Sequence, residues 1–179
     1  MVALAVGAVA VGVALAAPLD HRAEGDVAWH MVQHLLLTAV AAPAVALADV
    51  PGTLLAALSD VAPRLRRRRR RLIGSTGGRR WRYWAVTSLL AAVATLWFWH
   101  LPAPYDAALR NDVVHLAEHA TLLTSATVFW WVLVGLRRRR RYGAAVLVAF
   151  TFSLSSIALG AWLTFARRPL YASVSATEL

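Results

Sequence analysis

Histidines at regular spacing are the residues of this chain with the clearest potential for chemistry. His30 and His34 are four residues apart, and His115 and His119 repeat that spacing later in the chain. Residues four apart lie on one face of an α-helix, about one turn from each other, so each pair would present two imidazoles in one direction. Imidazole nitrogens bind copper, zinc, iron and nickel. The pairs predict a metal or haem site, unless they serve as interfacial anchors or as hydrogen-bond donors between helices.

Three further side chains extend this candidate site. His100 ends a separate apolar segment and is a fifth candidate ligand. Glu118 directly precedes His119 and is expected to accept a hydrogen bond that fixes the tautomer of a ligand ring. Met31 offers a soft thioether, although it points about 100° away from the preceding histidine on the helix. The remaining histidine, His21, lies in a polar stretch outside the pairs.

The composition excludes several other kinds of site. The chain has no cysteine, so disulfides, thiolate zinc sites and iron–sulfur clusters cannot form within it. Met31 and Leu116 occupy the positions where zinc proteases with paired histidines carry a glutamate. The sequence has no glycine-rich phosphate loop, no serine nucleophile elbow and no pair of catalytic carboxylates. We therefore predict that the protein is not an enzyme.

Long apolar segments must position these histidines. Of the 179 residues, 59% are hydrophobic, and a membrane-spanning helix needs about 20 apolar residues, with a range of about 17–25. Five segments satisfy this length, namely residues 1–19, 29–48, 81–101, 113–136 and 142–166. The sequence predicts an all-α fold, a single polytopic transmembrane helix bundle over residues 1–179. The first segment is alternatively a signal peptide, because Ala14-Leu15-Ala16 resembles a cleavage site, although no positive region precedes it.

Arginine clusters orient the predicted bundle. The net charge is +10, and most of the arginines lie in residues 64–82 and 137–141, between apolar segments. The positive-inside rule places both clusters in the cytoplasm, with the N-terminus inside and the C-terminus outside. All six histidines then fall on the outer side, with His34 and His119 about 6–8 Å below the membrane rim. Because the basic clusters are short and flanked by spans, we expect contacts with membrane lipids and no binding of nucleic acid.

Three stretches of the sequence resemble the CtaG-like family of cytochrome c oxidase assembly factors. They are His30-Met-Val-Gln-His34 with Ala41-Ala-Pro43, Trp99-His100-Leu-Pro102-Ala-Pro-Tyr105-Asp106, and His115-Leu-Ala-Glu118-His119 with Phe129-Trp-Trp131. Their order and spacing match the family across most of the chain, and Pro169-Leu-Tyr171 resembles a motif that follows a late helix. Members of the family usually have more helices, so the chain is expected to be a fragment or a shortened member.

The resemblance implies a function, a location and a set of residues. The family comprises polytopic membrane proteins that assemble haem–copper oxidase of the caa type. This implies copper handling in the plasma membrane of a bacterium, with oxidase subunits or other assembly factors as partners. The residues carried over by motif are His30, His34, His100, His115 and His119 as metal ligands, with Trp99, Tyr105, Asp106 and Glu118 around them.

We therefore expect an assembly factor that binds copper through outer-face histidines and delivers it to the oxidase. Imidazole sites hold Cu(I) less strongly than thiolates do, which favours transfer. The main alternative is a haem-binding membrane protein with one axial histidine from each of two helices, which would show a Soret band. A copper tolerance or uptake protein is another alternative, and it predicts a polar path across the bilayer. A small bundle with an open lipid-facing side could also form a homodimer.

Overall fold

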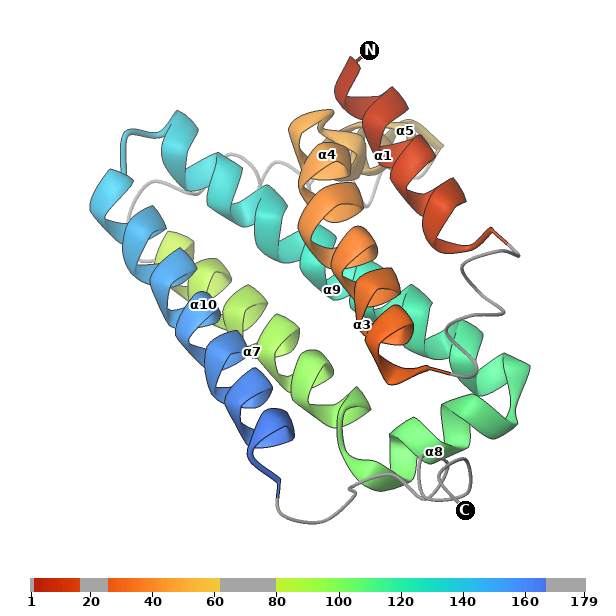
Figure 1. The fold of residues 1–179 in the computed structure, drawn as a ribbon. Coiled ribbons are helices and arrows are strands. Elements are labelled where there is room, and N and C mark those ends of the chain that lie inside the picture. The colour runs from red at the N-terminus through yellow and green to blue at the C-terminus, as the bar shows by residue number, and fades with distance from the viewer. Residues whose placement is uncertain (1, 17–25, 62–79, 167–179) are drawn as a thin grey trace, which may run out of the picture.

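Helices make up every regular element in the part of the chain that the structure describes (Figure 1). The structure, a computed structural model, describes residues 2–16, 26–61 and 80–166. In chain order the elements are α1 (Val2–Ala14), α3 (Val27–Leu35), the π-helical segment η1 (Leu36–Ala41), α4 (Ala42–Leu47), α5 (Val50–Val61), α7 (Arg80–Trp99), α8 (Pro102–Arg110), α9 (Asp112–Arg138) and α10 (Tyr142–Thr164). The all-α fold predicted from the sequence is confirmed.

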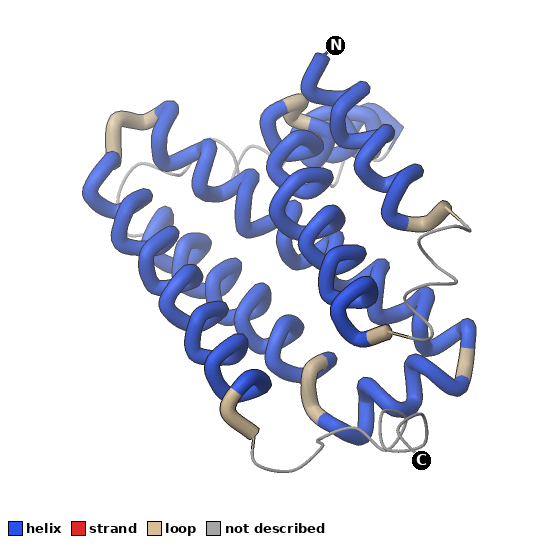
Figure 2. Tube along the Cα trace, in the orientation of Figure 1, coloured by secondary structure: helices blue, strands red, loops and turns tan. Residues whose placement is uncertain are grey.

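The long helix α9 lies at the centre of the bundle. It packs against α7, α8, α10 and the rod formed by α3, η1 and α4, while α1 lies on the far side of that rod (Figure 1). Figure 2 shows that short connections join α7 to α8, α8 to α9 and α9 to α10. Gly7 lets α1 approach α4 closely, because a β-carbon there would lie 3.1 Å from Val45 Cγ2. Gln33 Nε2 also donates a 2.8 Å hydrogen bond to the Ala14 carbonyl, which ties the end of α1 to α3.

Three helices are long and apolar enough to cross a membrane. They are Ala28–Leu47, Asp112–Arg138 and Tyr142–Thr164, and a fourth is added if Trp81–Trp99 and Pro102–Arg110, bent by 69°, form one span. These helices coincide with four of the predicted segments to within two residues at each end. α1 has 13 residues, which at about 1.5 Å each reach only about 20 Å, short of a hydrocarbon core of about 30 Å. The described residues thus contain three or four candidate spans, and a fifth span at α1 stays a prediction.

A π-helical turn interrupts the rod immediately after α3. In η1 the Ala42 N–H donates to the Leu37 carbonyl, five residues back, and not to the Thr38 carbonyl. Pro43 has no N–H to offer, so the Thr38 carbonyl receives no donor from its own helix. Trp130 of α9 supplies one, with Nε1 3.0 Å from that oxygen. The chain therefore accommodates Pro43 with a widened turn, and the Thr38 carbonyl of that turn attaches the rod to α9.

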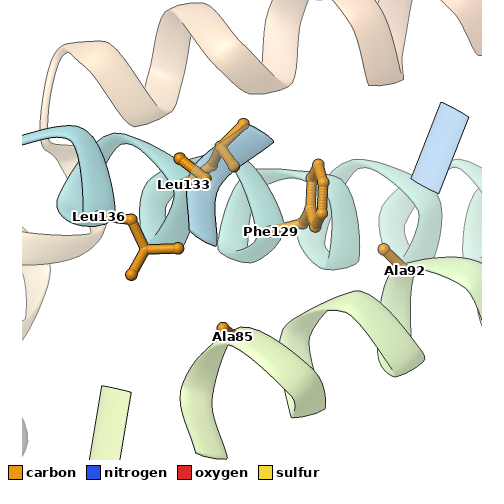
Figure 3. Close-up of a cluster of buried hydrophobic side chains, with 6 residues drawn as sticks. Ala85, Ala92, Phe129, Leu133 and Leu136 are labelled. Carbon is orange, nitrogen blue, oxygen red and sulfur yellow. The ribbon is translucent and has the colours of Figure 1, made fainter. Parts of the chain in front are cut away.

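The larger apolar cluster lies toward the end of the bundle away from the histidines, and a smaller one, formed by Trp99, Ala108 and Leu122, packs near them. Phe129, Leu133 and Leu136 of α9 face Ala85 and Ala92 of α7, and all five are buried (Figure 3). Small residues on α7 let the two backbones approach closely, which is a common basis of helix packing inside membranes. This contact holds α7 against α9 and so determines where the histidine-bearing end of each helix lies.

The segment that follows His100 corrects the prediction. The sequence suggests an outer loop over residues 102–112, shaped by prolines, but the chain forms helix α8 up to Arg110. Pro102 occupies the first helical position, where the missing N–H costs nothing because that N–H has no partner within a helix. Leu101 is extended and separates α8 from α7, and α8 turns back to pack on α9. The prolines thus begin a helix that covers the histidine end of the bundle.

The two basic ends of the described helices meet at the opposite end. Arg141, which precedes α10, places its guanidinium carbon 4.7 Å from the centre of the Trp81 ring at the start of α7. Residues 64–71 and Arg79 lie outside the described residues. The arginines at 80–82 and 137–141 therefore belong to one end of the bundle, as the topology predicted from charge requires.

Candidate metal centre

Helices α3 and α9 carry their histidines in the same register. The Asp26 side chain caps α3 by accepting the Ala28 N–H at 2.7 Å, and the Asn111 side chain caps α9 by accepting the Val113 N–H at 2.9 Å. In each helix a histidine follows the cap after four residues and another after eight. Capping residues define where a helix begins. The two helices therefore start at matching positions relative to their imidazoles.

Four imidazoles pack directly against one another. His30 and His34 of α3 have ring centroids 4.3 Å apart, and so do His115 and His119 of α9. Between the helices, the centroid distance is 5.4 Å for His30 with His115 and 5.4 Å for His34 with His119. His115 is half-buried and the other three are buried. The structure thus brings both predicted pairs into one cluster inside the bundle.

Glu118 lies between the two turns of histidines. Its Oε2 is 3.6 Å from His30 Nε2, and its Oε1 is 3.4 Å from His34 Nε2. The side chain is fully buried. The sequence suggests an acceptor for one ring, whereas here the two carboxylate oxygens reach two different rings. A carboxylate within a membrane helix is costly unless it is paired, so Glu118 is a functional candidate in its own right.

These side chains form two potential metal-binding groups among the described residues. Atoms of His30, His115 and Glu118 lie within 4.8 Å of one another, and atoms of His34, Glu118 and His119 do the same. Within the described part of the chain, neither nitrogen of His30 or His34 and neither oxygen of Glu118 has a hydrogen-bond partner. Buried polar atoms are nearly always hydrogen-bonded, and an unsatisfied one costs about 1–3 kcal/mol. A cation would satisfy these atoms, and the nitrogen and oxygen donors suit copper or zinc.

His100 and Met31 lie together beside this cluster and add an imidazole and a soft thioether donor. His100 Nδ1 lies 2.7 Å from the Leu96 carbonyl, and since a carbonyl only accepts, Nδ1 carries the proton in the neutral ring. His100 Nε2 then presents its lone pair to Met31 Sδ at 3.3 Å. The His100 ring centroid is 5.6 Å from that of His34. The fifth candidate histidine therefore joins the cluster, and Met31 meets it there.

The other predicted residues surround the cluster from α7 and α8. Tyr105 is buried, with its ring centroid 5.1 Å from that of His30. Trp99 Nε1 donates to Thr121 Oγ1 at 2.8 Å and so anchors the end of α7 to α9. Asp106 is half-buried on α8. Neither Trp99 nor Asp106 contributes to the two metal-binding groups.

Sequence reasoning missed three residues that position the cluster. Gln33 is fully buried beside His34 and holds α1 through the Ala14 carbonyl. Asp26 and Asn111 cap the two histidine-bearing helices. The sequence did contain features that could have identified them. Gln33 is a polar residue inside an apolar segment, and each capping residue lies four residues before a histidine. His21, by contrast, lies outside the described residues.

Comparison with protein families identifies the group to which the chain belongs. The family model described as cytochrome c oxidase caa3 assembly factor matches residues 1–178. The chain belongs to this family. No curated protein and no solved structure matches it. The resemblance carried by the three histidine-bearing stretches is thus confirmed over nearly the whole chain.

Membership in the caa3 assembly factors sets the general role of the protein. The family indicates a factor in the assembly of cytochrome c oxidase, for which oxidase components are plausible partners. Assembly factors are generally non-catalytic, and the apolar helices of this one are typical of a membrane protein. In this family member the buried histidines and Glu118 lie together inside the bundle.

Proposed function

We propose that this assembly factor binds copper in the histidine cluster and delivers it to the oxidase. The observation that carries the proposal is the set of buried atoms of His30, His34 and Glu118 that lack hydrogen-bond partners among the described residues. A bound cation would offset the free energy lost by burying them. Haem–copper oxidases contain copper, so copper is the cation that a factor for their assembly would carry.

The donor set also favours transfer over permanent storage. Thioether and imidazole ligands accept Cu(I), and the chain has no cysteine thiolate to hold it more tightly. The Met31 sulfur beside His100 adds a soft donor next to the cluster. We infer that the protein binds copper with an affinity low enough for release to a partner with stronger ligands.

The packing of the cluster bears on the two alternative functions. A haem with two axial histidines needs a flat macrocycle between the rings. Here the imidazoles of α3 and α9 that would flank it pack against each other, with centroids 5.4 Å apart, which favours a small ion. Copper uptake needs a polar path, whereas the far end of α9 is packed with apolar side chains such as Phe129 and Leu133. This packing favours delivery at one face of the membrane.

We place the protein in the bacterial plasma membrane with the cluster facing the extracytoplasmic side. His119 and Arg137 are separated by 18 residues of α9, about 27 Å along a helix, which approaches the hydrocarbon thickness of about 30 Å. The cluster and the basic end therefore suit opposite faces of a bilayer. Since basic loops are retained in the cytoplasm, the cluster would face outward.

A metal-binding assay on the detergent-purified full chain tests the proposal. The protein is loaded separately with Cu(I), Zn(II) and haem, washed, and examined for metal content and for its visible spectrum. We expect Cu(I) to be retained by wild type and at least tenfold less tightly by His34→Ala and His119→Ala. Asp112→Asn is the matched control, because Asp112 is exposed at the start of α9.

Two results would contradict copper binding by the cluster. A Soret band that disappears in both histidine variants would support the haem alternative. Retention of neither metal nor haem would assign the histidines a structural role.

In cells that lack the factor, re-expression of wild type should restore the copper content of the oxidase, and re-expression of His34→Ala should not.

A further inference from the structure

We infer that the cluster binds two cations, one at each turn of histidines, bridged by the Glu118 carboxylate. The inference rests on the proposed function, since it specifies how the cluster would hold copper. It assigns His30 and His115 to an outer cation and His34 and His119 to an inner one. Glu118 is the only residue common to both groups among the described residues.

The matching register of the two helices produces this pairing. His30 and His115 each follow their helix cap by four residues, and His34 and His119 follow by eight. Each turn of α3 therefore meets the corresponding turn of α9, as the equal centroid distances of 5.4 Å across the helices indicate. The diagonal between His30 and His119 is longer, at 6.3 Å. The rings thus divide into two cross-helix pairs, and each pair can close on its own ion.

The carboxylate distances match ligands that share an ion. Two ligands bound at about 2.0–2.2 Å to one tetrahedral ion lie about 3.4 Å apart. The distance from His30 Nε2 to Glu118 Oε2 is 3.6 Å, and that from His34 Nε2 to Glu118 Oε1 is 3.4 Å. Because each imidazole meets a different oxygen, one carboxylate can bind one ion through each oxygen. Two-metal sites hold their ions about 3.5–4 Å apart, which a bridging carboxylate allows.

Charge balance favours two monovalent ions in this position. Four neutral imidazoles and one carboxylate carry a single negative charge, so two Cu(I) ions leave a net charge of only one. Two divalent ions would leave a much larger uncompensated charge inside the bundle, and buried charge is costly there. The site is therefore suited to a pair of Cu(I) ions.

Anaerobic titration of the full chain with Cu(I) alone tests the inference. Bound copper is counted by elemental analysis and by competition with a chromogenic Cu(I) chelator. We expect two equivalents in wild type, one in His115→Asn and one in His119→Asn, since each substitution removes a ligand from only one group. Asparagine keeps a polar side chain at each position, which limits disruption of the fold.

Glu118→Gln tests the bridge itself. Glutamine preserves the shape of the side chain but removes the negative charge and one metal-binding oxygen, so the second equivalent should bind at least tenfold more weakly. Asp112→Asn makes the same change of charge at an exposed position of the same helix and should retain both equivalents. X-ray absorption of the wild-type protein loaded with Cu(I) should detect a neighbouring copper, and this measurement requires no variant.

The outcomes separate this inference from the proposed function. One equivalent in wild type, lost in both histidine variants, would establish a single copper site and overturn the bridged pair. Two equivalents that are unaffected by Glu118→Gln would overturn the bridge. No bound copper in wild type would refute the proposed function together with the inference.

Discussion

At the scale of single residues, the proton on His100 determines what its neighbour can contribute. The Leu96 carbonyl accepts the Nδ1 proton, so Nε2 and the Met31 sulfur face each other at 3.3 Å as two lone-pair donors. A neutral imidazole and a thioether cannot share a hydrogen bond in this arrangement. The inner Cu(I) ion assigned to His34 would lie next to them, because the ring centroids of His34 and His100 are 5.6 Å apart, and binding to that ion would turn the contact into a favourable one.

We therefore predict that Met31→Leu weakens Cu(I) binding and leaves Zn(II) binding nearly unchanged. Leucine has a similar volume, so the loss of packing should be small, whereas the thioether, a donor suited to Cu(I), is removed. Parallel competition titrations with the two ions measure the effect, with an expected fall of about tenfold for Cu(I). An equal fall for Zn(II) would mean that Met31 acts through packing and not as a ligand.

At the scale of elements, the helix caps control the position of the histidines. Asn111 accepts the N–H groups of Val113 and Val114 at 2.9 and 3.1 Å, and its carbonyl accepts the His115 N–H at 3.0 Å. The first turn of α9 is therefore tied to the residue that begins it. Any fraying of this turn displaces His115 before it displaces His119.

Asn111→Ala should lower the free energy of unfolding by about 1 kcal/mol, because alanine cannot cap the helix. It should also weaken metal binding, with the larger effect on the ion bound by His115. Unfolding in detergent and metal titration measure the two effects. Asn111→Asp retains a capping oxygen and is the matched control. A stable Asn111→Ala protein with unchanged metal affinity would show that packing alone positions α9.

The π-helical turn in η1 leads to a second prediction for an element. Trp130→Phe removes the donor to the partly buried Thr38 carbonyl, and the loss of one hydrogen bond costs about 1 kcal/mol. The variant should unfold more readily, and α3 should lose its fixed distance to α9. The control is Trp162→Phe on α10, because the ring there is 37% exposed and stacks on Trp97, a contact that phenylalanine can keep. Comparable stability of the two variants would mean that the Thr38 carbonyl finds another donor.

At the scale of the whole molecule, apolar length predicted five helical segments because burial in lipid requires about 20 apolar residues per span, and each segment contains a described helix. Helix α8 was not predicted, because a proline is equally compatible with a turn and with the first position of a helix. The role of Glu118 between two rings also escaped prediction. It depends on α3 lying beside α9 in matching register, and periodicity within one helix carries no information about its neighbour. The capping residues Asp26 and Asn111 could have predicted that register, because each precedes the first histidine of its helix by four residues.

The opposite placement of the histidine cluster and the basic end predicts how the molecule lies in its membrane. The chain has no cysteine, so a single introduced thiol is the only labelling site. Arg110 is exposed at the end of α8 near the cluster, and Gly143 is exposed at the start of α10 near Arg141. A membrane-impermeant maleimide applied to intact cells should label Arg110→Cys and not Gly143→Cys.

Permeabilised cells provide the control for this experiment, because both variants should then react and the cysteine-free protein should remain unlabelled. The reason for the asymmetry is that basic loops are retained on the cytoplasmic side. Labelling of Gly143→Cys alone in intact cells would reverse the orientation. The histidines would then take their metal from the cytoplasm, and delivery to the oxidase would have to occur on that side of the membrane.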